Sequence, residues 1–271
     1  MLAAERRSRI LTLLERDGTV RVSDLVLDLG VSDMTVRRDL GAMHDLGLLE
    51  KVHGGAVSPA GPSTAEPGFE AKSTRQLAQK EAIAARGARL VPPGAAIAVS
   101  AGTTTHALAR HICAVPDLTV VTNSVRVAEV LHAADNPTLS VLLTGGLRTP
   151  SDALVGPLAI AALGSLHLDM VFLGVHGMDE QAGFTTPNLL EAETNRAMIA
   201  SGRKLVVLAD STKWGLVGLS SMAALSEASS VITDSTLSAR ARRAIGEHVD
   251  ELILVDADPG LEPDGMARTT A

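Results

Sequence analysis

The sequence predicts an α/β protein in two parts: a small, mostly helical N-terminal domain and a larger domain with a mostly parallel β-sheet. A stretch rich in Pro, Gly and Ser, residues 58–74, follows the first 57 residues and is typical of a linker. Beyond it, short runs of Val, Leu and Ile alternate with helical patterns, and each run ends in small or polar residues. Hydrophobic residues make up 46% of the 271, enough for a sizeable core. We therefore expect domains over residues 1–57 and 75–256, joined by the linker and followed by a flexible tail over residues 257–271.

The first domain is predicted to contain three helices followed by a two-stranded hairpin. Apolar residues recur at helical spacing over residues 2–16, 23–29 and 32–46. Ser23 and Ser32 are expected to cap the second and third helices at their N-termini, and Gly30 is expected to end the second. Short strands over residues 48–52 and 56–57 flank a glycine-containing turn and form a hairpin-like wing.

Two short helices on either side of a Gly30 turn, the second with adjacent arginines, suit a helix-turn-helix, whose second helix reads the DNA major groove. The inward stripe of that helix consists of Val36, Leu40 and Met43. Thr35 and Arg38, three residues apart on the exposed face, are the best candidates for contact with bases. Arg37 points about 100° away from Arg38 and is expected to meet phosphate. The further DNA-binding candidates, on the helix cap and the wing, are Ser32, Lys51, His53 and Gly54.

Two observations leave an alternative open for this domain. Its first 57 residues contain eight Lys and Arg against nine Asp and Glu, so it has no excess of positive charge. Asp39 is acidic on the proposed DNA-facing helix, and we interpret it as orienting an arginine, although an ordinary solvated carboxylate is an equal alternative. The domain could therefore be a three-helix protein-interaction module whose arginines form a solvated face.

Composition excludes several classes of protein. The formal net charge of −7 excludes a globally basic nucleic-acid coat, and the four aromatic residues make base stacking on RNA or single strands improbable. A single cysteine, Cys113, cannot form an internal disulfide, and no apolar run is long enough to span a membrane, so we expect a cytoplasmic protein. The eight histidines show no zinc-site spacing, and no nucleotide-binding loop or hydrolase motif occurs. We expect no metal, no cofactor and no catalytic residues.

The larger domain is predicted to be a largely parallel α/β sheet. Its predicted strands are residues 95–99, 118–122, 139–143, 169–173, 205–208, 231–232 and 252–255. In such sheets ligands bind outside the carboxyl ends of the strands. The first strand is followed by a Gly/Thr turn and a helix predicted over residues 106–112, an arrangement that can hold an anion. A well-capped turn without a ligand is the alternative at this place.

Hydroxyl, glycine, carboxylate and lysine residues at this edge suit a small phosphorylated ligand rich in hydroxyl groups. The predicted ligand residues are Gly102, Thr103, Thr104, Thr105, Thr122, Asn123, Gly145, Gly146, Gly174, Asp179, Glu191 and Lys213.

Both domains resemble a known family. Residues 18–25, 31–40 and 47–56 resemble the winged helix-turn-helix of the DeoR family of bacterial transcriptional regulators (DeoR/GlpR-type), most specifically in Thr-Val-Arg-Arg-Asp-Leu and His-Gly-Gly-Ala. The larger domain resembles the family's effector domain at residues 79–84, 102–105, 122–124, 144–146, 156, 172–174, 177–179, 183 and 210–213. The resemblance implies a sensor domain similar in fold to ribose-5-phosphate isomerase and the sugar-phosphate deaminases, which hold phosphate in the corresponding Gly-Thr loop.

The resemblance implies a repressor of sugar-metabolism genes that binds double-stranded operator DNA and is released by a phosphorylated sugar. Since one winged helix contacts only a short half-site, we expect a homodimer or homotetramer, with no membrane partner. The alternative is a sugar-phosphate isomerase or deaminase with an added helical domain. His176 to Glu180 resembles the isomerase's Asp-Gly-Ala-Asp-Glu, but has His at the first acidic position, and residues 183–186 replace its lysine and glycine run.

Overall fold

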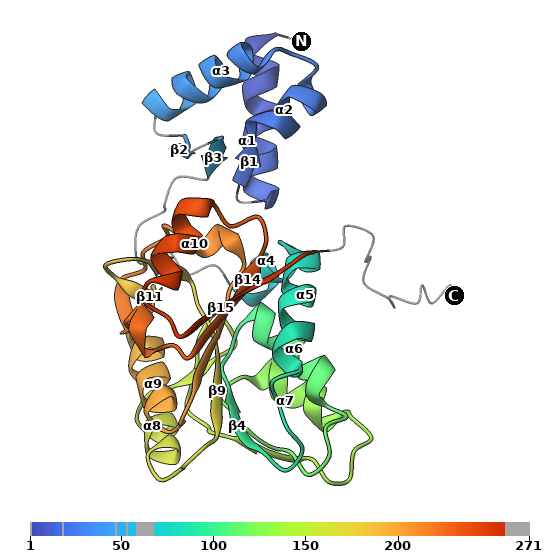
Figure 1. Ribbon diagram of the computed structural model, residues 1–271, viewed down its shortest axis with the longest axis vertical. Coiled ribbons are helices and arrows are strands. Elements are labelled where there is room, and N and C mark those ends of the chain that lie inside the picture. The colour runs from blue at the N-terminus through green and yellow to red at the C-terminus, as the bar shows by residue number, and fades with distance from the viewer. Residues whose placement is uncertain (1, 18, 47, 53, 58–67, 258–271) are drawn as a thin grey trace. The chain divides into compact units, whose positions relative to one another are not determined.

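The computed structural model describes residues 2–17, 19–46, 48–52, 54–57 and 68–257. The chain divides into two compact units, Met1–Ala65 and Glu66–Ala271 (Figure 1). The buried apolar residues of the N-terminal unit form one cluster, and those of the second unit form two separate clusters. No helix in the described ranges is both long enough and apolar enough to cross a bilayer.

The N-terminal unit is a winged helix-turn-helix, as the sequence predicts. Its helices are α1 (Ala3–Asp17), α2 (Val22–Leu29) and α3 (Asp33–Asp45). Its strands β1 (Thr19–Arg21), β2 (Glu50–Val52) and β3 (Gly55–Val57) form an antiparallel sheet in the order β1-β3-β2. Hydrophobic side chains from all three helices, among them Ile10, Leu25 and Val36, form the core of the unit. Leu40 and Met43 are buried with Val36, so the predicted inward stripe of α3 is confirmed.

One predicted helix cap is confirmed and another is wrong. Ser32 caps α3, since its Oγ accepts a hydrogen bond from the backbone N–H of Thr35 at 3.3 Å. Gly30 ends α2 in the left-handed conformation with φ 63°. Ser23, in contrast, lies inside α2, which begins one residue earlier at Val22. The backbone N–H of Val22 donates to the carbonyl of Gly54 in the wing at 2.8 Å, so tertiary structure satisfies this helix end without a serine cap.

The second unit contains a seven-stranded parallel sheet in the order β15-β14-β12-β9-β4-β5-β6. Its strands are β4 (Ala96–Val99), β5 (Thr119–Thr122), β6 (Ser140–Leu143), β9 (Met170–Gly174), β12 (Leu205–Leu208), β14 (Ser230–Asp234) and β15 (Glu251–Val255). All of these overlap runs that the sequence predicts as strands, and the predicted parallel α/β architecture is confirmed.

Helices cover both faces of this sheet (Figure 1). One face packs against α5 (Leu77–Ala88), α6 (Thr103–Ile112) and α7 (Val125–His132), and the other against α8 (Pro157–Leu163), α9 (Leu189–Ala200) and α10 (Ala239–Gly246). The two-residue period of a strand distributes the side chains between these layers. In β9, Phe172 packs with the α5–α7 cluster, whereas Val171 and Leu173 pack with the α8–α10 cluster.

Several short elements have no counterpart in the sequence prediction. They are α4 (Phe69–Ser73), β7 (Leu147–Arg148), β8 (Leu154–Val155), β10 (Gly177–Asp179), β11 (Gly183–Thr186), β13 (Ser220–Ala223) and the 3-10 turns η1 (Ser211–Lys213) and η2 (Leu225–Glu227). Helix α4 lies inside the stretch predicted as linker. Helix α6 begins at Thr103, three residues before the predicted start at His106, so its three threonines form the first helical turn.

The order of the strands creates a crevice at one end of the sheet. From β4 the chain continues to β5 and β6 on one side, and β9 begins the series on the other side. The loops that leave β4 and β9 therefore separate in opposite directions at the carboxyl ends of the strands. Such a switch point is where ligands bind in open α/β sheets.

Candidate functional site

A cleft that is partly open to solvent lies at the switch point. Its walls come from the loops after β4, β5, β9 and β12, from the β7–β8 loop, and from α4, α6, α9, β11 and β13. The polar or charged residues that line it are Lys72, Thr103, Thr104, Asn123, Ser151, His176, Thr186, Glu191, Asn195 and Lys213.

The first wall of the cleft is the N-terminus of α6. Gly102 precedes the helix with φ 149°, a backbone conformation that side-chain-bearing residues rarely adopt. The helical ladder starts with the His106 N–H, which donates to the Gly102 carbonyl at 2.9 Å. The N–H groups of Thr103, Thr104 and Thr105 have no hydrogen-bond partner within the described ranges. Three N–H donors at the positive end of a helix dipole therefore converge beside the cleft.

Neighbouring strand ends hold this turn in place. The Ala101 N–H donates to Asn123 Oδ1 at 3.0 Å, which ties the turn to the end of β5. Ser100 Oγ accepts from the Gly174 N–H at 2.9 Å and donates to the Ala101 carbonyl, which ties it to the end of β9. Ser100 is buried and does not line the cleft, so its hydroxyl positions the turn.

Lysines give one side of the cleft a positive charge. Lys213 is the last residue of η1, in the loop that follows β12, and its ammonium group has no hydrogen-bond partner among the described residues. Lys72, on α4, lines the same cleft. Behind it, Lys80 of α5 is buried and donates to the Lys72 carbonyl at 2.5 Å. Burial lowers the pKa of Lys80 to about 8, and the nearby carboxylate of Asp210 only partly offsets this effect.

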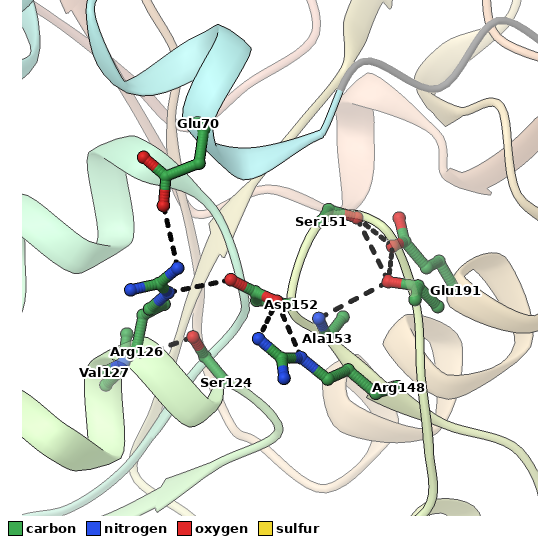
Figure 2. A network of polar contacts seen from close by, with 10 residues as sticks. Glu70, Ser124, Arg126, Val127, Arg148, Ser151, Asp152, Ala153 and Glu191 are labelled. Atoms are coloured by element: carbon green, nitrogen blue, oxygen red, sulfur yellow. Dashed lines mark hydrogen bonds and ion pairs between the residues drawn. The ribbon is translucent and has the colours of Figure 1, made fainter.

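A wall of hydrogen-bond acceptors is built on α9. Glu191 Oε1 accepts from Thr149 Oγ1 at 2.7 Å and from Ser151 Oγ, and its Oε2 accepts from Thr186 Oγ1 at 3.1 Å. Figure 2 shows the Ser151 hydroxyl directed at this carboxylate. Asn195 follows four residues later and therefore lies on the same face of α9. The cleft thus has a donor side with positive charge and an acceptor side with negative charge.

A polar network fastens α4 to the loop that carries Ser151 (Figure 2). Arg126 of α7 pairs with Glu70 at 2.8 Å and with Asp152 at 2.7 Å. Asp152 also pairs with Arg148 at 2.6 Å. The Arg126 guanidinium lies 5.2 Å from the centre of the Phe69 ring, close enough for a cation–π interaction. Burial acts to raise the pKa of Asp152, but the hydrogen bonds and charges of its two arginines outweigh it and hold that pKa below its ordinary value.

The structure brings seven of the twelve predicted ligand residues together in the cleft: Gly102, Thr103, Thr104, Asn123, Gly174, Glu191 and Lys213. The other five do not line it. Among them, Thr105 Oγ1 donates to the Gly102 carbonyl and Thr122 Oγ1 donates to the Val99 carbonyl. Asp179 Oδ1 accepts backbone N–H bonds from the turn after β10. The remaining two, Gly145 and Gly146, adopt positive φ angles between β6 and β7. These residues shape the turns around the site.

Sequence reasoning missed Lys72, Ser151, Thr186 and Asn195 as lining residues, and considered His176 only as a departure from the isomerase motif. Only Asn195 had a clear signal, because it lies one helical turn after Glu191 and shares its face. No group of three or more His, Cys, Asp or Glu side chains in the described ranges could hold a metal ion.

In the N-terminal unit, the candidate DNA contacts lie on α3 and the wing. Arg38 is exposed and forms no hydrogen bond or ion pair with another described residue. Arg37 is exposed and pairs with Asp33 one turn earlier at 2.5 Å. The Thr35 hydroxyl lies 2.9 Å from Ser32 Oγ at the start of the helix. Lys51 and Gly54 are exposed on the wing, and His53 lies outside the described residues.

Asp39 is buried and pairs with two arginines of α1, Arg6 at 2.8 Å and Arg7 at 3.3 Å. The interpretation that this carboxylate orients an arginine is therefore confirmed, and the solvated alternative is wrong. The arginines concerned belong to α1 and not to α3. This pair of interactions fixes α3 against α1 and neutralises an acidic group on the helix that carries the candidate base contacts.

Known transcriptional regulators are similar to this chain over most of its length. The transcriptional regulator GlpR of Haloferax volcanii is 39% identical over 246 residues, which cover 90% of this chain and 95% of that protein. The lactose phosphotransferase system repressor of Staphylococcus aureus is 34% identical over 231 residues, covering 85% of this chain and 91% of that protein. Among solved structures, ribose 5-phosphate isomerase A from Neisseria gonorrhoeae aligns over 54% of this chain and 55% of that one, with 15% identity and a TM-score of 0.36. At these values the alignment carries no argument about ligand or activity.

Models of protein families match both units. Residues 6–61 match the DeoR-like helix-turn-helix domain, and residues 75–235 match the DeoR C terminal sensor domain. The family and these relatives are transcriptional regulators and not enzymes, so the alternative of an isomerase or deaminase is not favoured. The chain belongs to the DeoR family of DNA-binding transcriptional regulators.

Proposed function

We propose that this regulator is a repressor that binds operator DNA through α3 and the wing and leaves it when a phosphorylated sugar occupies the cleft of the sensor unit. One observation carries the proposal: amide donors and lysines face a wall of acceptors across a cleft at the switch point of the sheet. A phosphorylated sugar has an anionic group for the first side and hydroxyl groups for the second.

The phosphate is proposed to lie on the N-terminus of α6. The N–H groups of Thr103 and Thr104 would donate to its oxygens, and the helix dipole favours negative charge at that position. Gly102 has no side chain to obstruct a bound phosphate. Lys213 has no hydrogen-bond partner among the described residues and would supply a full positive charge. The sugar would then extend toward Asn123 and Glu191, which line the cleft beyond the turn.

The operator contacts are proposed on α3 and the wing. Arg38 and Thr35 would contact base edges, since an arginine can make two parallel hydrogen bonds to guanine. Arg37 and Lys51 would contact phosphates, with Ser32, His53 and Gly54 alongside. The name of one relative is consistent with control of sugar use, since it is a lactose phosphotransferase system repressor. Because its DNA target is intracellular, we place the protein in the cytoplasm.

We further infer that the protein acts as a homo-oligomer, with β6 in the contact between copies. Strand β6 is at one edge of the seven-stranded sheet, and its Leu142 and Leu143 are 45% and 44% exposed. An exposed apolar edge strand is a ready template for pairing with another chain. Sedimentation should therefore give a dimer or tetramer, and Leu142→Lys should lower that mass. A parent protein that is monomeric at micromolar concentration, with and without operator DNA, would contradict this inference.

A binding experiment tests the central proposal. The protein is bound to a labelled DNA fragment from upstream of its own gene, and fluorescence anisotropy follows release as sugar phosphates are added. We expect at least one sugar phosphate to release the DNA, while the same sugar without phosphate has no effect at high concentration. The proposal fails if the protein binds the fragment but no sugar phosphate binds the protein or changes its affinity for DNA.

A further inference from the structure

We propose that Asn195 Oδ1 accepts a hydrogen bond from a donor group of the ligand, at the end of the ligand away from its anionic group. This inference rests on the proposed function and specifies its ligand more closely. A ligand that satisfies it is a polyol phosphate or an amino-sugar phosphate with a hydroxyl or amino group in reach of α9. A ligand with only an anionic group, or with acceptors alone at its other end, does not satisfy it.

The first observation is a buried carbonyl oxygen without a partner. Asn195 is only 8% exposed and lines the cleft, and its Oδ1 has no hydrogen-bond partner within the described ranges. Its Nδ2 donates to Met222 Sδ at 3.1 Å. The opposite orientation of the amide would place the carbonyl oxygen against the thioether sulfur, and neither of these atoms can donate a hydrogen. Met222 therefore determines which end of the amide remains available, and that end is an acceptor.

Buried polar atoms in folded proteins almost always have partners, so an unpartnered one beside a cleft indicates a missing ligand atom. Two other buried side-chain oxygens without partners in the described ranges, on Asp210 and Thr233, do not line the cleft. The Asp210 carboxylate also interacts with the charge of Lys80. Asn195 is thus the residue at which an unpartnered buried acceptor and the cleft coincide.

The second observation is the neighbour of Asn195 on α9. Glu191 lies one turn earlier and faces the same cleft. Its Oε2 accepts one hydrogen bond, from Thr186, and a carboxylate oxygen has room for more. Two acceptors one helical turn apart suit two donors on adjacent atoms of a ligand, such as neighbouring hydroxyl groups or a hydroxyl and an amino group. The amides and Lys213 on the other side select the anionic end.

Titration calorimetry with Asn195→Leu tests the assignment, because leucine keeps the approximate size and removes the acceptor. The probes are inorganic phosphate, ribose 5-phosphate, glucose 6-phosphate and glucosamine 6-phosphate. We expect the affinity for the best sugar phosphate to fall about 10- to 100-fold, the range that corresponds to leaving a polar group unpaired. Affinity for inorganic phosphate should change less than twofold. The melting temperature without ligand should be equal to that of the parent or higher, because the variant no longer buries an unpaired carbonyl.

Glu193→Gln is the matched control, since Glu193 is an exposed residue of the same helix, and it should leave all affinities unchanged. Asn195→Asp decides the matter if the leucine variant does not fold. It keeps an acceptor and adds negative charge, so it should favour glucosamine 6-phosphate over glucose 6-phosphate at least tenfold more than the parent does.

Three outcomes overturn the inference: a folded Asn195→Leu with unchanged sugar-phosphate affinity, a parallel loss of phosphate and sugar-phosphate binding, or an Asn195→Asp with the parent's preference. A parent protein that binds none of the sugar phosphates overturns the proposed function itself. The two failures are therefore distinguishable.

Discussion

Arg126 and Asp152 form an ion pair at 2.7 Å in which the aspartate is buried and the arginine also holds Glu70 of α4. The residue before Asp152 is Ser151, which donates to Glu191 in the wall of the cleft (Figure 2). One short loop thus contributes one side chain to the cleft, and the next side chain is joined to α4 through Arg126. Because α4 contributes Lys72 to the same cleft, this pair stabilises two of its walls together.

Asp152→Asn should destabilise the sensor unit at neutral pH by about 1–3 kcal/mol, since it removes the carboxylate that pairs with both Arg126 and Arg148. The folded state lowers the pKa of Asp152, so the stabilisation is present above the ordinary aspartate pKa and is lost as the pH falls through the folded-state value. Asparagine tolerates the positive φ of 60° at this position, so backbone strain adds little. Urea unfolding of parent and variant from pH 7 down to pH 3 measures the difference.

The control is Glu81→Gln, which removes a partly exposed carboxylate that pairs with Arg110 at 2.7 Å in the same unit. Exposed pairs contribute about 0–1 kcal/mol, so this variant should stay close to the parent. The free energies of unfolding of the parent and of Asp152→Asn should converge toward low pH. If their difference stays the same, charge pairing is not the source of the stability.

The ammonium group of Lys80 should make the free energy of unfolding depend on pH in the alkaline range. Its folded-state pKa of about 8 lies below its ordinary value of 10.5, so between these values the unfolded chain binds more protons than the folded one. The free energy of unfolding of the parent should therefore rise with pH relative to Lys80→Met, by an amount on the order of 3 kcal/mol across that window. Below pH 8 the free energies of unfolding of the parent and of Lys80→Met should change with pH in parallel. Denaturation at pH 7, 8, 9 and 10 checks this, and parallel curves throughout would refute it.

Arg38→Ala should lower the affinity for the operator relative to random DNA by about 1–3 kcal/mol, because it removes a base contact from an exposed side chain. Arg37→Ala is the comparison variant. A phosphate contact carries no sequence information, so this variant should weaken binding to both DNAs equally. The slope of the logarithm of the binding constant against the logarithm of the salt concentration should become smaller in magnitude by about one. Anisotropy titrations at several salt concentrations measure both effects. Unchanged operator affinity in a folded Arg38→Ala protein would exclude the assignment.

The large sheet could be predicted because its signal is local. Each of its strands is an apolar run followed by small or polar residues, and that pattern is visible without tertiary structure. The short antiparallel strands could not be found this way. All four residues of β11 are buried and show no alternation, since β10 and β13 cover its edges and the core covers its faces. Phe69 of α4 is buried beneath Arg126, but its sequence neighbours are typical of a linker.

The candidate site was predictable where it follows the ends of the parallel strands, as at Gly102, Asn123 and Lys213. Composition at a strand end does not separate a residue that faces the ligand from one that builds the turn. Thr104 and Thr105 are adjacent threonines, yet Thr104 lines the cleft and Thr105 is fully buried with its hydroxyl on Gly102.

The last prediction joins effector binding to DNA release. In Gly102→Val the new Cβ would lie 3.1 Å from Thr105 Oγ1, and a β-branched residue is strained at φ 149°. The backbone N–H groups at the start of α6 would no longer converge, so the phosphate would lose these hydrogen-bond donors. Operator binding should remain nearly intact, because the winged helix is a separate unit. The response to sugar phosphate should be abolished, giving a permanently bound regulator.

Lys213→Ala should act in the same direction more weakly, since it removes one charge and leaves the amide cradle in place. Gly246→Ala is the control, because a Cβ there meets open space at an ordinary φ. Coupling between two sites is typically about 1–3 kcal/mol, so the parent's operator affinity should change by about 5- to 150-fold on saturation with effector. Anisotropy with the effector as titrant measures this change in each variant. If a folded Gly102→Val still releases DNA at the parent's effector concentration, the turn serves only the fold and the effector binds elsewhere.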